Sequence, residues 1–291
     1  AVDRRRATDP DPDDRFRGLY ITDAQVDALL AGPPEPLVTD ETAIASSALL
    51  AALDARAASA EDGDRSRLVA LASAFELDTL DVDLLLVALA PDLDPRFERL
   101  YGYLHDDVSR RRASVGLALE LCDPGSRPGM SPLRGRLGPL ATLVSRGLLI
   151  VEDVDRPFLT RSLRVPDRVA AHLLGDDSVD PVLETLRADA VEVPCEEVDA
   201  LARALGVGVR LCYLRERTGA SGYSLARSAL TRLGRRAVVL DVARLGAGDD
   251  VQAVAASAAR EAALSGAGLV VGPVDVLAGH GAAAVRAFAE A

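Results

Sequence analysis

The order of the apolar segments after residue 200 is the feature that most restricts what this chain can fold into. Short runs rich in Val and Leu alternate there with longer runs whose apolar residues recur at helical spacing. Strands separated by helices form parallel sheets, because each helix returns the chain to the start of the next strand. The sequence therefore predicts an α/β module, with strands in 206–214, 235–245 and 267–277 and helices in 223–234, 249–266 and 279–291.

The loop after the first predicted strand has the pattern of a phosphate-binding loop. Residues 217–224 read RTGASGYS, where the pattern is G-x-x-x-x-G-K-[ST]. Gly222 and Ser224 fit it, and Gly219 fits an additional glycine found in one subgroup of such loops. Tyr223 stands where a lysine would reach the outer phosphates, and the whole sequence contains no lysine.

The end of the third predicted strand lacks the carboxylates that phosphoryl transfer requires. An Asp there would orient Mg²⁺, and a Glu would polarise the attacking water. Gly272 and Pro273 occupy these positions. Because both sides of the phosphate have lost a functional group, we expect no catalytic residue and no metal site in this segment. Two alternatives stay open: weak nucleotide binding by the backbone of 219–224, and hydrolysis with arginine in place of lysine.

A second pattern, upstream, predicts a winged helix. Helices are expected at 77–91, 94–107 and 114–122, two short strands at 148–153 and 159–166, and a closing helix at 166–175. A DNA-reading helix needs polar side chains that reach base edges, and 114–122 is mostly apolar. The candidates for contacts with a partner or with nucleic acid are therefore cations around it, namely Arg110, Arg111, Arg112, Arg161 and Arg164.

Charge is distributed unevenly along the chain, whose formal net charge is −12. Residues 201–291 hold 11 Arg and 7 acidic residues, a balance of +4, which leaves −16 for the first 200. Such a chain is a poor general binder of nucleic acid, and a local basic face is the alternative that stays open. The three cysteines have no paired spacing, and no apolar run reaches the ~18–20 residues of a membrane span. We expect a cytoplasmic protein without a membrane span.

Composition divides the chain into five parts. The expected fold class is an α-helical N-terminal part with a winged helix (α+β), followed by a partial α/β module of the P-loop NTPase kind. Its boundaries are a disordered lead-in at 1–17, a helical region at 18–75, a winged-helix domain at 76–175, an acidic linker at 176–202 and the incomplete α/β module at 203–291.

Residues 80–122, LDVDLLLVALAPDLDPRFERLYGYLHDDVSRRRASVGLALELC, resemble the winged-helix segment of bacterial AAA+ ATPases of the kind associated with contractile injection systems. Residues 163–181 resemble the stretch that follows, and the resemblance covers about 75–291. It implies a degenerate AAA+ module here, and an intact module, with ATP and Mg²⁺, only outside this chain.

The resemblance further implies a non-catalytic segment without a cofactor of its own. Such a segment would bind a protein client or ring neighbours in a homo-oligomer. The residues themselves leave two alternatives, which are a nucleic-acid-binding winged-helix regulator and a weak nucleotide sensor.

Overall fold

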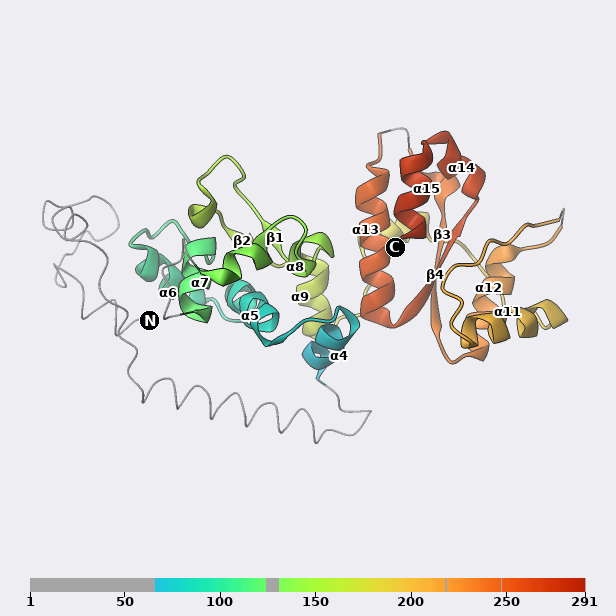
Figure 1. Cartoon of the computed structure of the whole chain (residues 1–291), viewed down its shortest axis with the longest axis horizontal. Coiled ribbons are helices and arrows are strands. Elements are labelled where there is room, and N and C mark those ends of the chain that lie inside the picture. The colour runs from blue at the N-terminus through green and yellow to red at the C-terminus, as the bar shows by residue number, and fades with distance from the viewer. Residues whose placement is uncertain (1–65, 124–130, 218, 247, 291) are drawn as a thin grey trace, which may run out of the picture. The chain divides into compact units, whose positions relative to one another are not determined.

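The computed structural model describes residues 66–123, 131–217, 219–246 and 248–290, and the chain divides into two compact units, 1–170 and 171–291 (Figure 1). The predicted lead-in at 1–17 lies outside the described residues. So does the helical region at 18–75, except for its end, which contains α4 (Arg67–Ala74). Among the described helices, none has the length and apolar character needed to cross a membrane.

Three helices of the first unit confirm the predicted pattern, namely α5 (Thr79–Leu93), α6 (Arg96–His105) and α7 (Val115–Cys122). Their starts are set locally by side-chain caps. The Asp78 carboxylate accepts a hydrogen bond from the Asp81 N–H at 3.0 Å, and the Ser114 hydroxyl accepts one from the Leu117 N–H at 3.1 Å.

The prediction that Pro91 stops the first helix is wrong, because α5 continues through it to Leu93. A proline inside a helix has no N–H to donate to the carbonyl four residues earlier, which here belongs to Val87. The Tyr101 hydroxyl donates to that carbonyl oxygen at 2.7 Å. A side chain from α6 thus satisfies the acceptor that Pro91 leaves open.

The remaining elements of the first unit form a small wing. Strands β1 (Ile150–Val151) and β2 (Leu163–Arg164) pair antiparallel, as the two-strand ribbon requires. Residues 133–147, whose sequence predicts a mixed segment that is helical after Pro139, lie in the 3-10 turn η1 (Pro132–Leu137) and then in α8 (Thr142–Ser145). A second 3-10 turn, η2 (Phe158–Thr160), contacts α7, and the chain leaves the unit within α9 (Asp167–Leu173).

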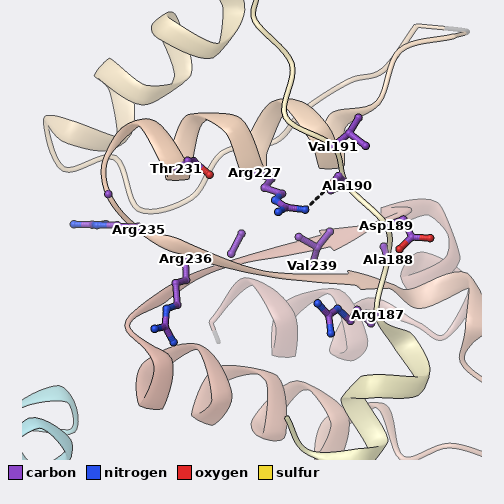
Figure 2. A pocket seen from close by; sticks show the side chains of 12 residues that line it. Arg187, Ala188, Asp189, Ala190, Val191, Arg227, Thr231, Arg235, Arg236 and Val239 are labelled. Carbon is purple, nitrogen blue, oxygen red and sulfur yellow. Dashed lines mark hydrogen bonds between the residues drawn. The ribbon is translucent and has the colours of Figure 1, made fainter. Parts of the chain in front are cut away.

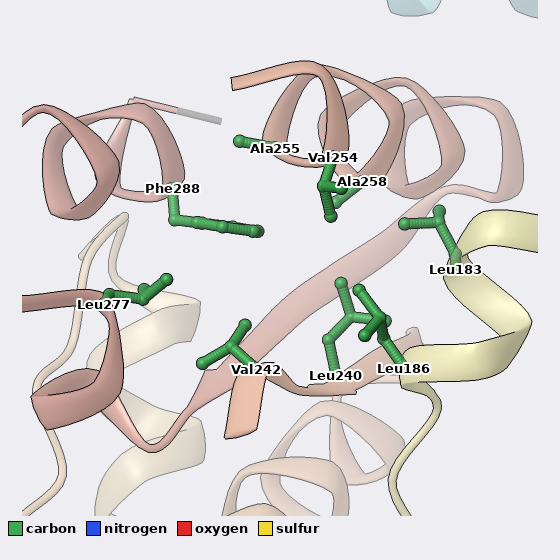
Figure 3. Packing of buried hydrophobic residues seen from close by; sticks show 9 residues of the cluster. All are labelled: Leu183, Leu186, Leu240, Val242, Val254, Ala255, Ala258, Leu277 and Phe288. Atoms are coloured by element: carbon green, nitrogen blue, oxygen red, sulfur yellow. The ribbon is translucent and has the colours of Figure 1, made fainter. Parts of the chain in front are cut away.

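The second unit is built on two parallel strands, β3 (Arg236–Asp241) and β4 (Ala267–Gly272). The helices α12 (Gly222–Arg232) and α13 (Val251–Ser265) both pack on the two strands, and α14 (Val274–Gly279) and α15 (Ala282–Ala289) follow β4. The small side chains of Ala255 and Ala258 allow α13 to pack closely on the two strands. Figure 3 shows the core cluster, which contains Leu183, Leu186, Leu240, Val242, Val254, Ala255, Ala258, Leu277 and Phe288.

The predicted strand at 206–214 is wrong. Gly206 ends α11 (Glu196–Gly206), and residues 207–217 contain no strand. Alternating apolar residues favour a strand only where a neighbouring strand pairs with the backbone and covers one face. Here the alternating side chains stay in solvent, with Val207 83% and Tyr213 73% exposed.

The predicted acidic linker at 176–202 is instead part of the second unit. It forms α10 (Pro181–Leu186), an extended segment and α11, and Leu183 and Leu186 are buried in the core. We call residues 187–191 the strap. Its Ala188 N–H donates to the Val239 carbonyl of β3 at 3.0 Å, beside an antiparallel bridge between Arg187 and Leu240. Most of the acidic side chains are exposed on the outer faces of these elements, whereas Asp180 is largely buried and pairs with Arg260 at 3.2 Å.

The close approach of α12 to β4 leads to the first prediction. A Cβ atom at Gly268 would lie 2.6 Å and 2.7 Å from the two terminal carbons of the buried Leu230 side chain. We expect Gly268→Ala to lower the free energy of unfolding by about 1–3 kcal/mol through overpacking. Urea unfolding would measure it, with Gly279→Ala as the control, since no atom lies within 4 Å of a Cβ there. Equal stability of the two variants would contradict the packing.

Candidate functional site

The predicted loop and the predicted strand end lie together at the carboxyl ends of β3 and β4. Asp241 and Gly272 are register partners at the ends of the two strands. A Cβ atom at Gly272 would lie 3.1 Å from the Tyr223 hydroxyl oxygen and 3.2 Å from a ring carbon of the same tyrosine. The Tyr223 side chain therefore lies against the place where the first carboxylate of a phosphate-transfer site would stand, and only glycine leaves it this room.

A carboxylate from the chain itself occupies the start of α12. The Glu216 Oε1 atom accepts a hydrogen bond from the Gly222 N–H at 2.6 Å. The N–H groups at a helix N-terminus are the donors that would face a bound phosphate. A Cβ at Gly222 would lie 2.6 Å from the same oxygen, so the glycine makes room for this carboxylate. The sequence analysis missed Glu216, because the phosphate-loop pattern contains no position for an internal acceptor.

Ser224, the predicted magnesium-binding hydroxyl, is buried with 4% of its surface exposed. Its Oγ accepts a hydrogen bond from the Val191 N–H of the strap at 3.2 Å, and its own N–H donates to the Ser221 hydroxyl at 3.3 Å. The remaining predicted residues lie apart from these contacts. Gly219 is exposed with a φ of +88°, which glycine adopts without strain, and Pro273 precedes α14 as its N-cap.

The electrostatics of the site keep Tyr223 neutral. Burial of the hydroxyl, together with the negative charges of Asp241 and Glu216, raises the pKa of Tyr223 to about 12. Asp241 caps the 3-10 turn η3 (Val242–Arg244) and lies 3.3 Å from the Arg244 guanidinium. The neutral Tyr223 hydroxyl cannot supply the positive charge that the outer phosphates of a nucleotide need, and the nearby Arg244 guanidinium is paired with Asp241.

The winged-helix arginines are mostly engaged within the first unit. Arg110 lies 3.3 Å from Asp107, Arg111 3.7 Å from Glu98 and Arg112 3.9 Å from Asp92. Arg164 pairs with Glu152 at 2.6 Å. Arg161 donates to the backbone carbonyls of Arg156 at 2.9 Å and Val154 at 2.6 Å.

A small pocket of about 330 Å³ brings Arg110, Arg111 and Arg112 beside Arg156 of the wing, whereas Arg161 and Arg164 do not line it. Asp107 and Asp153 also line this pocket, so its charge is mixed. Helix α7, the predicted reading helix, has no exposed residue, and Val115, Leu117, Ala118 and Leu119 are fully buried. Helix α7 therefore presents no exposed polar face of the kind that reads base edges.

The three helices and the wing have a counterpart among known families. A family model described as "Winged helix domain, variant" matches residues 1–186, which is more than half of the chain. The chain belongs to the winged helix domain family, in its variant form. No curated protein and no solved structure matches it. The two parallel strands and the loop at 216–224 lie beyond the matched residues.

The pKa of Tyr223 gives a prediction for alkaline pH. Its phenol ionises near pH 10 in the unfolded chain but at about 12 in the folded one, so its stabilising contribution is complete below pH 10 and is lost as the pH rises toward 12. Thermal unfolding at pH 9 and pH 11 should therefore show a smaller alkaline loss of stability in Tyr223→Phe than in the native chain. Tyr213→Phe is the control, because Tyr213 is 73% exposed. An identical alkaline loss in all three proteins would show that Tyr223 is not buried against β4.

Proposed function

We propose that this chain is a non-catalytic, partner-binding region of an AAA+ ATPase, which holds a protein client and helps to organise a ring. The winged-helix family match and the resemblance of residues 80–122 support the class of protein. The observation that carries the absence of catalysis is the 2.6 Å hydrogen bond from the Gly222 N–H to Glu216, which fills the phosphate position with an internal carboxylate.

Three further features argue against hydrolysis by this module. Tyr223 replaces the lysine, the Ser224 hydroxyl is engaged by the strap, and Gly272 replaces the carboxylate that would act through magnesium. A nucleotide would have to displace Glu216 and would then meet the charge of Asp241 near Tyr223. ATP and Mg²⁺ are therefore assigned to an intact module outside the residues of this chain.

A protein is favoured over nucleic acid as the partner. The first unit leaves large apolar side chains in solvent near the junction of α5 and α6, where Leu93 is 49%, Phe97 36% and Leu100 38% exposed. Aromatic and aliphatic side chains of this kind form the cores of protein interfaces. We place the client contact on these three residues. The resemblance implies a homo-oligomeric ring and service in a contractile injection system, and the three cysteines without paired spacing favour a cytoplasmic location. These expectations complete the proposal.

Calorimetric titration with ATP and ADP, with and without Mg²⁺, tests the loop. We expect no heat from the native chain at millimolar nucleotide. Glu216→Ala frees the Gly222 N–H and should gain weak binding, without turnover, because neither lysine nor carboxylates are restored. The Glu197→Ala variant is the control, since Glu197 is an exposed acid of α11. Micromolar binding by the native chain would instead make the module a nucleotide sensor.

An electrophoretic shift assay with duplex DNA at low salt tests the class of partner. We expect no shift of the native chain, because α7 offers no exposed polar side chain and the nearby arginines face acidic residues. A shift that weakens steeply with salt and is abolished in Arg110→Gln with Arg111→Gln would overturn the proposal in favour of a nucleic-acid-binding regulator.

A further inference from the structure

The strap separates from β3 halfway along the strand and leaves a pocket between itself, the last turns of α12 and the start of β3 (Figure 2). The pocket has a volume of about 770 Å³. Thr231, Gly234 and Arg235 line it at the end of α12, and none of residues 216–224 does, so it is distinct from the degenerate phosphate site. The strap stays open here because its residues Ala190 and Val191 bond to α12, through Arg227 and the Ser224 hydroxyl, and not to β3.

Cations dominate the lining of this pocket. Arg187, Arg227, Arg235 and Arg236 line it, against a single acidic residue, Asp189. No hydrogen bond or ion pair within the described residues engages the side chains of Arg235 and Arg236, and Arg187 forms only an exposed pair with Glu184 at 3.3 Å.

The pocket also exposes the edge of a strand. The Val239 carbonyl points toward the strap, because it accepts from the Ala188 N–H at 3.0 Å. Residues two apart in a strand direct their backbone groups to the same side, so the N–H and C=O of Ala237 point into the pocket. Neither group has a partner on that side among the described residues.

The arginines lie on both sides of this free edge. In Figure 2 the side chains of Arg187 and Arg236 lie on one side of β3, and those of Arg227 and Thr231 lie on the other side, below α12. A strand added to the edge would direct its side chains alternately to these two sides. Every second side chain would then meet the Arg187 and Arg236 guanidinium groups.

We propose that this pocket binds an acidic, extended segment of a partner protein, which adds a short strand to the start of β3. Its backbone pairs with the N–H and C=O of Ala237, and its carboxylates accept paired hydrogen bonds from Arg187 and Arg236. The walls formed by Ala188, Ala190 and Val239 accommodate small apolar side chains between the acidic ones. A phosphate-bearing ligand would satisfy the arginines but would leave the strand edge unpaired, so a polypeptide is the occupant that the geometry favours.

This inference deepens the proposed partner-binding function and names a second contact for it. The test is fluorescence anisotropy with a labelled, end-capped six-residue peptide of alternating Glu and Val. The double variant Arg187→Gln with Arg236→Gln should bind it at least tenfold more weakly than the native chain. Arg210→Gln with Arg215→Gln is the matched control, because both arginines are exposed and lie outside the pocket. The two substitutions remove the same positive charge as the double variant in the pocket.

Two further probes separate strand pairing from charge alone. A peptide of the same sequence with N-methyl groups on alternate residues keeps its charge but loses half of its backbone donors, and it should bind more weakly than the parent. Equal loss of binding in both double variants, or undiminished binding of the methylated peptide, would overturn the proposal. Tripolyphosphate that binds more tightly than the peptide would also overturn it and would assign the pocket to phosphate.

The outcome is independent of the nucleotide and DNA experiments. If the peptide does not bind, and neither ATP nor DNA binds, the peptide-binding role of this pocket is refuted. The proposed partner-binding function then still stands. A shift with duplex DNA would refute the proposed function whether or not the peptide binds. Thermal unfolding of each double variant checks that folding is preserved, which is expected because the only side-chain ion pair lost within the described residues, that of Arg187 with Glu184, is exposed to solvent.

Discussion

The hydrogen bonds by which α12 holds the strap determine the form of the second unit. Ser224 accepts from the Val191 N–H at 3.2 Å, and Ser228, one turn later, accepts from the Val193 N–H at 2.9 Å. Both serines are buried, so each hydrogen bond gives a serine hydroxyl and a backbone N–H a protein partner in place of water. They draw the strap away from β3 toward the helix. The engaged Ser224 hydroxyl and the open pocket beside β3 are both consequences of this one attachment.

The same attachment explains why the loop keeps the shape of a phosphate site without its chemistry. A helix N-terminus leaves backbone N–H groups that need an acceptor. Ser221 provides one acceptor for Ser224 N–H, and Glu216 provides another for Gly222 N–H. Gly222 thus leaves room for an internal carboxylate at the start of α12. Tyr223 then covers the end of β4, where its neutral ring replaces a solvated cation.

What the sequence could predict was local. Caps such as Asp78 and Ser114 act within three residues, and they set helix starts that the structure reproduces. The two-strand wing and the parallel β3–β4 pair follow from apolar periodicity and the order of the segments. Two of the failures have non-local causes. Pro91 is tolerated because of Tyr101, and the alternating residues from Val207 to Tyr213 remain without a partner strand.

The candidate site shows the same difference between what the sequence predicts and what only the structure reveals. The motif located Gly222, Tyr223 and Gly272, and the structure brings them together, but the residue that fills the phosphate position, Glu216, has no place in the motif. The sequence did not predict the strap, because the acidic residues around it are typical of a solvated linker. Its role depends on contacts with Ser224 and Val239, which lie more than thirty residues away in the sequence.

The absence of lysine makes every cation of this chain a guanidinium group, and sequence position alone does not tell which of them are available to a partner. Arg161 uses its planar donors to hold the wing carbonyls of Val154 and Arg156, and Arg227 donates to the Ala190 carbonyl of the strap. These arginines keep their charge but have a fixed structural role. Arg236 begins a strand at an open edge and has no such partner among the described residues, so its five donors remain for a ligand. Among the arginines that line the pocket, Arg235 and Arg236 therefore keep their donors for a ligand beside β3, whereas the RRR run before α7 faces Asp107, Glu98 and Asp92.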